Sequence, residues 1–334
     1  MPDAPTTLLV EDLRGLVRAL PDDLRLPVIE CIVARGRRDR IRADSPNHLR
    51  YELLGLDAPQ RIPVAALTRA SNEGEAPPVG SVWLRADPVT LRADMVRVFT
   101  VAHGYQGCDE GERAEIDRIV REAFAHAGFT LADDASAPWC LSLDGHLGFD
   151  FLPLPDTLGR DVADALPDDP AAAAWKRLMT EIQVDLHQST VNVRRRQRGL
   201  PEINSVWFWG AGAIGTAESP GNRAGRCTVV SDDPVSRGLA VVENFPLHGQ
   251  SDLAGLEPPA NGAMLVDWVM PSNDVHTEAT ALEAAARHLL ARTGRGIQLV
   301  DGNGNRWAFG PRFRWRFWKR IEPLRKAMDA EGAV

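Results

Sequence analysis

Apolar residues recur at helical spacing through the first 57 residues of the chain. They stand three or four positions apart, and Pro21 with the two aspartates after it ends the first run. Two further helices are predicted over residues 27–38 and 49–56. Residues 1–60 are therefore expected to form a helical N-terminal segment. The residues that carry the first run are Leu8, Leu9, Leu13, Leu16 and Leu20.

The spacing changes after a loop rich in Pro and Glu at residues 71–78. Short apolar runs then flank one longer helical pattern, which is typical of a small α+β domain with an antiparallel sheet. We place this domain at residues 61–150. Its predicted elements are strands at 81–88 (stopped by Pro88), 94–100, 129–131 and 139–143, and a helix at 109–127 followed by Gly128.

The remaining residues, 151–334, predict an α/β core domain. A linker rich in Pro and Asp at 150–170 leads to a long helix at 171–198, which Gly199-Leu200-Pro201 ends. Buried-strand patterns then alternate with a helical one, so we expect a doubly wound, mostly parallel sheet. The predicted elements are strands at 203–209, 227–230, 263–270, 297–300 and 306–309, a helix at 278–292, and a hairpin turn at 301–304.

Composition indicates an acidic globular protein. The 334 residues are 44% hydrophobic and 25% charged, with a net charge of −8. This charge opposes binding to nucleic acid or to an anionic membrane, so neither is expected as a partner. Four separated cysteines without a CxxC pair indicate reduced thiols, and we find neither a membrane span nor a signal-peptide pattern. A cytoplasmic location is expected, and the oligomeric state is not indicated.

Two stretches carry a likeness to a known family. The first joins residues 63–69 to 82–88 and includes Arg85-Ala86-Asp87-Pro88. The second runs from 181 to 210 and ends in the more specific Asn204-Ser205-Val206-Trp207-Phe208-Trp209-Gly210. Over most of residues 60–215 the chain resembles the bacterial RpfE-type regulatory proteins, which are often labelled phosphoglycerate mutase-like. The wider superfamily of archaeal-type, cofactor-independent mutases and alkaline phosphatases implies a doubly wound core with a small inserted α+β domain.

The chain departs from the chemistry that this resemblance implies. A working member needs an Asp-Gly after the first strand, a Ser or Thr nucleophile, and a late Gly-Asp-His that helps hold two divalent metals. We find no N-terminal strand with Asp-Gly and no Gly-Asp-His, and Trp209 stands where an arginine is expected. We therefore expect no metal, no cofactor and no metal-dependent mutase activity.

The function expected from this comparison is non-catalytic. A degenerate phosphoglycerate mutase-like protein would bind a small anionic ligand or a protein partner and act in regulation. The alternative is an enzyme with residual or altered phosphoryl-transfer or hydrolytic activity built on His187 and the turn at Gly210. A third reading is a subunit of a larger assembly.

The candidate ligand-binding residues lie on either side of residue 200. Glycines after the strand at 203–209 would let a ligand approach backbone N–H groups, although a plain tight turn has the same composition. On the preceding helix, a polar stripe carries an imidazole and an amide that would face this turn; a solvated helix face is the competing reading. The candidates are His187, Asn192, Asn204, Gly210, Ala211 and Gly212.

Other polar residues favour a structural reading. Asp267, Asp274 and His276 follow a buried strand, but a metal would require a further ligand, for which His248 is the available guess. Arg85 and Asp87 are expected to form an ion pair at a strand end. The cysteines have no adjacent histidine that would activate them as nucleophiles.

The stretch from Arg312 to Arg320 interleaves cations with aromatic rings, a composition that invites a nucleic-acid interpretation. Its strict alternation from 312 to 317 instead predicts a strand with one aromatic face buried and the arginines outside. Trp315 is accordingly expected to be largely buried, and its replacement by Ala to destabilise the fold by roughly 3–5 kcal/mol.

Overall fold

The residue contacts of the computed structural model divide the chain into two units. The structure describes residues 5–129, 131, 137–215, 227–259, 262–270, 274–294, 296–313, 315–316 and 318–331. The first unit comprises described residues within 1–62, 70–75 and 218–334, and the second comprises 63–69 and those within 76–217. The second unit is thus inserted in the sequence of the first, and these bounds differ from the predicted divisions after residues 60 and 150.

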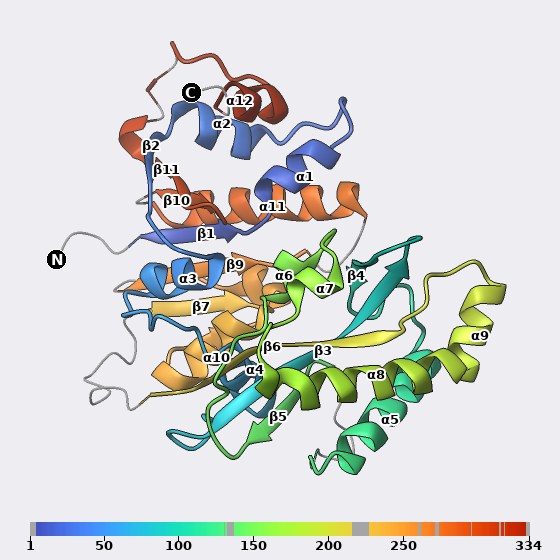
Figure 1. The fold of residues 1–334 in the computed structure, drawn as a ribbon. Helices are drawn as coiled ribbons and strands as arrows, with labels where there is room; N and C mark the ends of the chain where they lie inside the picture. The colour runs from blue at the N-terminus through green and yellow to red at the C-terminus, as the bar shows by residue number, and fades with distance from the viewer. Residues whose placement is uncertain are drawn as a thin grey trace. The chain divides into compact units, whose positions relative to one another are not determined.

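The first unit contains a seven-stranded sheet in the order β2-β11-β10-β1-β9-β7-β8. The five strands from β10 to β8 are parallel, and β11 and β2 continue the sheet antiparallel (Figure 1). A mostly parallel α/β sheet is what the sequence predicts. The strands are β1 Thr6–Val10, β2 Arg37–Arg40, β7 Cys227–Ser231, β8 Leu247–His248, β9 Ala263–Trp268, β10 Ile297–Asp301 and β11 Asn305–Phe309.

Helices cover both faces of this sheet. Leu8 and Val10 of β1 join a core with side chains of α1, α2, α11 and α12, whereas α3 lies on the opposite face from α11 (Figure 1). Alternate residues of a strand point to opposite faces, so a strand covered on both sides is apolar throughout. The helices are α1 Leu13–Ala19, α2 Pro27–Arg35, α3 Pro46–Leu54, α10 Pro234–Glu243, α11 Val275–Arg292 and α12 Leu324–Glu331.

The helical N-terminal segment predicted from the first leucines is wrong. Residues Thr6–Val10 form the strand β1, which pairs in parallel with both β9 and β10, and the first helix begins only at Leu13. Leu8 and Leu9 are both buried, on opposite faces of the strand. Such a strand shows no alternation, and its leucines therefore merged with the helical spacing of the next element. The N-terminal strand that was not predicted is thus present.

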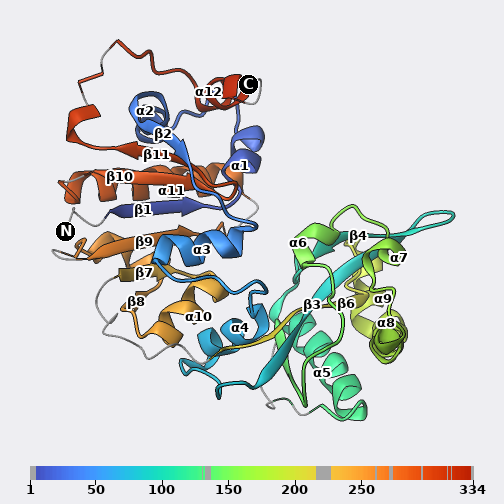
Figure 2. The same ribbon diagram turned by 60° about the vertical axis from the view of Figure 1, so that its left-hand side comes forward.

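The second unit contains an antiparallel sheet built around one long strand, β3 (Figure 2). One edge of β3 pairs with β6, and the other pairs first with β5 and then with β4. Helices α5 and α8 pack against each other, and α8 packs on β6. The elements are α4 Val64–Glu73, which begins in this unit, β3 Val82–Ala93, β4 Val98–His103, α5 Glu110–His126, β5 Trp139–Leu143, α6 Leu154–Thr157, α7 Val162–Ala165, α8 Ala173–Gln188, α9 Thr190–Gln197 and β6 Ser205–Ala213.

Two strand predictions in this unit need correction. The strand predicted at 203–209 is β6, and it runs antiparallel to β3 instead of joining the parallel core. Strand β3 does not stop at Pro88, because the carbonyl of that residue still accepts a hydrogen bond from Gly104 N at 2.8 Å and pairing continues to Ala93. The strand predicted at 129–131 is not formed at Phe129 or Leu131, and residue 130 lies outside the described residues.

The long helix predicted over 171–198 is divided at Ser189. This residue is extended, with ψ of 146°, and its hydroxyl accepts a hydrogen bond from Asn192 N, so α9 begins with its own N-cap. A serine can end one helix and start the next because its side chain satisfies an N–H group that the new helix leaves free. The apolar spacing on both sides of the break is helical and conceals it.

The predicted burial of Trp315 is also wrong. Trp315 is 74% exposed and Trp318 is 70% exposed, and residues Pro311–Phe313 form a short 3₁₀ helix instead of a strand. Arg314 and Phe317, which belong to the predicted alternation, lie outside the described residues. Successive turns with a three-residue repeat replace the two-residue repeat of a strand. The interleaved composition therefore does not produce a buried aromatic face.

Candidate functional site

Polar side chains gather at the carboxyl edge of the parallel sheet in the first unit. Glu11 directly follows β1, Asp233 lies two residues beyond β7, and Asp267 is near the end of β9. The register places Asp267 beside Leu9 of β1 and Ser231 of β7, so the ends of these strands meet. This edge is where open α/β sheets commonly bind ligands.

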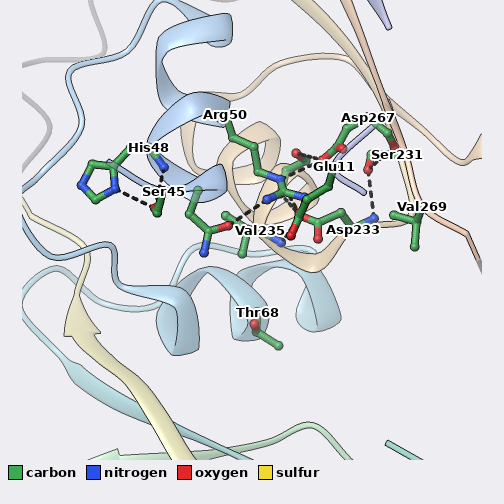
Figure 3. Close-up of polar contacts among 12 residues, drawn as sticks. Glu11, Ser45, His48, Arg50, Thr68, Ser231, Asp233, Val235, Asp267 and Val269 are labelled. Atoms are coloured by element: carbon green, nitrogen blue, oxygen red, sulfur yellow. Dashed lines mark hydrogen bonds and ion pairs between the residues drawn. The ribbon is translucent and has the colours of Figure 1, made fainter. Parts of the chain in front are cut away.

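Arg50, from helix α3, lies among these carboxylates (Figure 3). Its Nε is 2.9 Å from Asp267 Oδ2 and 3.3 Å from Asp233 Oδ1, and its Nη2 is 2.7 Å from Glu11 Oε2. The exposed fraction of the side chain is 4% for Arg50, 1% for Asp267, 18% for Asp233 and 42% for Glu11. One buried guanidinium thus contacts three carboxylates; we call these four residues the Arg50 cluster.

Local structure explains how the helical members of the cluster are positioned. Helix α3 begins at Pro46 after the N-cap Ser45, whose hydroxyl accepts from His48 N and lies 2.8 Å from His48 Nδ1. One turn later Arg50 faces inward, and its Nη1 donates to Asn47 Oδ1 at 3.0 Å. The start of α3 therefore holds the guanidinium in place with backbone capping and a neighbouring amide.

Asp233 has two structural functions at the start of helix α10. Its Oδ1 accepts hydrogen bonds from Val235 N and Ser236 N, both at 2.9 Å, which is an N-cap. The same oxygen is the one that approaches Arg50. The helix cap and the ion pair therefore hold the same oxygen of Asp233 in place.

Asp267 is the most buried carboxylate of the cluster. Its Oδ2 accepts from Ser236 Oγ at 2.6 Å and from Arg50, whereas its Oδ1 is buried without a hydrogen-bond partner among the described residues. Burial raises the pKa of Asp267, and the guanidinium of Arg50 opposes this rise. Burial alone lowers the pKa of Arg50, but the three carboxylates outweigh it and raise that pKa above its ordinary value.

The Arg50 cluster does not fit the two-metal centre that the family resemblance implies. Within the described residues no group of three or more His, Cys, Asp or Glu side chains is arranged to hold a metal ion. The carboxylates at the sheet edge already share a cation that is part of the chain. After β1 the sequence reads Glu11-Asp12 instead of Asp-Gly, and Asp12 caps α1 by accepting from Gly15 N at 2.9 Å.

The other acidic and histidine candidates near this edge have structural explanations. Asp274 is the N-cap of α11 and accepts from His276 N at 3.1 Å and from Thr277 Oγ1 at 2.6 Å. The hydroxyl of Thr277 is the largest of the effects that lower the pKa of Asp274. His276 lies in the first turn of α11 and His248 on β8. Helix capping therefore accounts for Asp274.

The predicted glycine turn is part of a strand. Gly210, Ala211 and Gly212 lie within β6, which continues to Ala213. Gly210 has φ of +67°, and a Cβ added there would be 2.8 Å from Val64 Cβ. A Cβ on Gly212 would be 2.9 Å from Pro63 Cα. These glycines therefore allow the residues at the start of α4 to pack closely on β6.

The side chains of the two predicted asparagines form hydrogen bonds with backbone groups. Asn192 is fully buried, and its amide donates to Leu186 O and Ile203 O and accepts from Ile203 N. Asn204 accepts from Leu91 N at 2.8 Å and donates to Leu91 O at 2.9 Å, which extends the β3–β6 ladder by one side chain. Both amides hold the second unit together.

His187 and Asn204 line one groove in the second unit, with a volume of about 430 Å³. The imidazole is exposed, and its Nδ1 is 3.9 Å from Glu202 Oε2. Asn192 and the glycines of β6 are not among the lining residues. The structure therefore brings together two of the six predicted ligand residues. The groove is lined by Leu91, Ala93, Val98, Thr180, Gln183, Val184, His187, Gln188 and Asn204.

Side chains from the two stretches that carry the family resemblance form hydrogen bonds with one another. Arg85 forms two hydrogen bonds with Asp87, at 2.7 and 2.8 Å, which confirms the predicted ion pair within β3. Trp209 Nε1 donates to Asp87 Oδ2 at 2.6 Å, and Arg85 Nη1 donates to Thr68 Oγ1 at 3.0 Å. Trp209, where the resemblance implies an arginine, thus serves as the donor to a buried aspartate.

Most of the Arg50 cluster escaped sequence reasoning, which named only Asp267. A partial signal was present, because an acidic residue follows the buried strands β1 and β7 at Glu11 and Asp233. Residues at strand ends share an edge only when the strands are neighbours, and the helical assignment of β1 removed that inference. No local pattern identifies Arg50, whose partners lie 39 and 217 positions away at Glu11 and Asp267.

Comparison with known proteins supports the fold. No family model and no curated protein matches the sequence. The structure is similar to the PH0037 protein from Pyrococcus horikoshii, with a TM-score of 0.51 and 14% identity over 98% of this chain and 93% of that one. It also matches the cofactor-independent phosphoglycerate mutase from Thermoplasma acidophilum, with a TM-score of 0.43 and 16% identity over 97% and 94% of the two chains. The first likeness shows a shared α/β fold.

Proposed function

We propose that this chain is a phosphoglycerate mutase-like protein that has exchanged metal-dependent catalysis for binding. The observation that carries the proposal is the position of Arg50, whose guanidinium lies within 3.3 Å of the carboxylates of Asp267, Asp233 and Glu11. Under this proposal the Arg50 cluster at the sheet edge stabilises the fold and does not hold catalytic metal ions. The protein would then act as a regulatory binder, as the RpfE-type resemblance implies.

The chemistry of an arginine supports this reading. In a two-metal centre the carboxylates coordinate ions that activate a nucleophile and neutralise the transferring group. A guanidinium remains protonated, offers only N–H donors and cannot generate a bound hydroxide. Arg50 forms ion pairs with Asp267, Asp233 and Glu11, so these carboxylates already have a cationic partner within the chain. The lack of a Gly-Asp-His sequence points the same way.

The groove beside His187 is the proposed binding surface. Its lining combines hydroxyl, amide and imidazole groups with four aliphatic side chains and contains no carboxylate. A small ligand could bury an apolar part against Leu91 and Val184 while an anionic group accepts a hydrogen bond from the imidazole N–H of His187. The alternative hydrolytic activity gains no support from the geometry, because the glycines it invokes lie inside β6.

Activity assays test the catalytic half of the proposal. Purified protein should not interconvert 2- and 3-phosphoglycerate in a coupled assay, with or without added manganese. A metal-stimulated turnover of about 1 s⁻¹ or more, the low end of the usual enzyme range, would contradict it. The variant Arg50→Ala provides a further comparison, because removing the guanidinium should not create activity if a nucleophile is also lacking.

Thermal-shift measurements with 3-phosphoglycerate, inorganic phosphate and nucleotides test the binding half. A ligand at 100 times its Kd stabilises the folded protein by about 2.7 kcal/mol. His187→Ala should abolish this stabilisation. Asp185→Ala is the matched control, because Asp185 is exposed on the same helix but does not line the groove. A shift that survives His187→Ala would show that the ligand binds elsewhere.

A further inference from the structure

The segment from Arg312 to Arg320 is a strongly basic stretch of an otherwise acidic chain. Its sequence holds five cationic residues, four aromatic residues and no carboxylate, while the whole chain has a net charge of −8. The segment follows the 3₁₀ helix Pro311–Phe313 and precedes α12. Its charge is therefore complementary to a polyanion, in contrast to the rest of the molecule.

A three-residue hydrogen-bond repeat organises this segment. The N–H groups of Phe313, Arg316 and Lys319 each donate to the carbonyl three positions earlier, at 2.9, 3.2 and 3.1 Å. Phe313 packs against the core of the first unit. Arg316 lies over the Phe313 ring, with its guanidinium carbon 4.4 Å from the centroid, and donates to Arg35 O at 3.2 Å. Phe313 and Arg316 therefore attach the segment to the unit.

Two tryptophans of this segment, one on either side of Arg316 in the sequence, are exposed. Trp315 has 74% of its surface accessible and Trp318 has 70%. Tryptophan is highly buried on average, so two exposed indoles within four residues indicate a binding surface.

We propose that the described residues of this segment bind single-stranded nucleic acid, with Trp315 and Trp318 stacking on bases and the exposed Arg312, Lys319 and Arg320 contacting phosphates. Each exposed ring offers a flat face on which one unpaired base can stack. This alternation of cations and rings is the general pattern of sequence-tolerant single-strand binding.

An anionic bilayer is the competing polyanion. Surfaces that insert into a bilayer present aliphatic as well as aromatic side chains to the acyl boundary. Among the described residues from 311 to 323, the exposed large hydrophobic side chains are Trp315 and Trp318, and the aliphatic side chain of Ile321 is half-buried. Two flat rings flanked by cations match bases and phosphates better than acyl chains, so we assign the segment to nucleic acid.

The test measures fluorescence anisotropy of fluorescein-labelled 12-mers of thymidylate (DNA) and uridylate (RNA) with the full chain at 50 mM salt. Binding to at least one is expected, with the two oligomers distinguishing DNA from RNA. Trp315→Ala and Trp318→Ala should each weaken binding about 5- to 150-fold, the usual effect of losing one stacking ring. Val96→Ala, at a hydrophobic residue that is 90% exposed in the second unit, is the control and should change nothing.

The salt dependence of the affinity distinguishes the contribution of the cationic side chains from that of the aromatic rings. Each phosphate neutralised contributes about −0.7 to the slope of log K against log salt for a single strand. Replacing Lys319 and Arg320 together by Gln should reduce the slope by about 1.4, whereas Arg177→Gln on helix α8 should leave it unchanged. The melting temperature of every variant should equal that of the parent, because the altered side chains are exposed.

Five outcomes would overturn the proposal. The first four are no binding to either 12-mer, binding that Trp315→Ala and Trp318→Ala leave intact, binding to phosphatidylglycerol vesicles without binding to oligonucleotides, and a salt-sensitive increase in molecular mass that the tryptophan variants abolish. The third would assign the segment to a membrane surface and the fourth to a second copy of this chain. A duplex 12-mer that binds as tightly as the single strand would exclude stacking on unpaired bases.

Discussion

Replacement of Arg50 by Met should destabilise the first unit strongly and in a pH-dependent manner. The substitution keeps much of the side-chain volume but removes the cation shared by three carboxylates. Breaking a buried ion pair by removing one partner costs about 3–5 kcal/mol, because the remaining charge is left in a poor solvent. Asp267, with 1% of its side chain exposed, accounts for most of this cost, whereas Glu11 is 42% exposed and can be solvated.

The pH dependence follows from the direction of the Asp267 pKa shift. Burial raises this pKa in the folded protein, and Arg50 opposes the rise, so Arg50→Met should raise it further. A raised carboxyl pKa means that the folded state binds more protons than the unfolded state, so stability falls as pH increases through that pKa. The loss on Arg50→Met should therefore be large at pH 7.5 and smaller near pH 4, because the Asp267 carboxyl of the folded variant takes up a proton as the pH falls through its raised pKa.

A half-exposed arginine of the same unit provides the matched control. Arg306 forms hydrogen bonds of 2.6 and 2.9 Å with Asp39, and the two side chains are 29% and 32% exposed. Because water can solvate Asp39 after the substitution, Arg306→Met should cost about 1 kcal/mol or less. Urea unfolding followed by circular dichroism measures both variants, with two transitions fitted if the units unfold separately. Equal losses for the two variants, or a loss for Arg50→Met that is the same at both pH values, would refute the reasoning.

Three further predictions concern single residues. Asn192→Ala should lower the free energy of unfolding, measured in urea, by at least about 1–3 kcal/mol, because the backbone groups that bond to this amide are left without a partner in a buried site. Gly212→Ala should cost about 1–3 kcal/mol because the new Cβ would crowd Pro63, whereas Gly145→Ala, with no atom within 4 Å of the added Cβ, should be close to neutral. Cys227 should be the last of the four cysteines alkylated by iodoacetamide at pH 8, measured by mass spectrometry, since burial raises its pKa to about 11.

Features encoded by neighbouring residues were predicted correctly. Helix α5 begins after Asp109, whose side chain accepts from Glu112 N, and the chain leaves it through Gly128 at φ of +90°. The hairpin between β10 and β11 uses Gly304 at φ of +79°. Caps and tight turns depend on residues three or four positions apart, so a sequence carries their signal directly.

Features that depend on residues far apart in the sequence were not predicted correctly. The five residues of β1 are all buried because other strands flank them and helices cover both faces, and such a run has no period of its own. At Trp315 the alternation of charged and aromatic residues was real, but the backbone forms turns with hydrogen bonds between residues three apart, and the indole is exposed. Arg50 could not be found because its function is defined by strand order and not by its neighbours.

The residues behind the family resemblance support a structural explanation of that resemblance. In the most specific run, Asn204 completes the ladder between β3 and β6, Trp209 donates to buried Asp87, and Gly210 lets the start of α4 approach β6. Each of these residue types is required by packing or hydrogen bonding inside the second unit, without reference to a substrate. A chain can therefore retain this run after it has lost the groups needed for phosphoryl transfer. The carboxyl edge of the parallel sheet, where Arg50 contacts three carboxylates, contains no residue of that run. The ion pairs at this edge are the observation on which the proposed absence of catalysis rests.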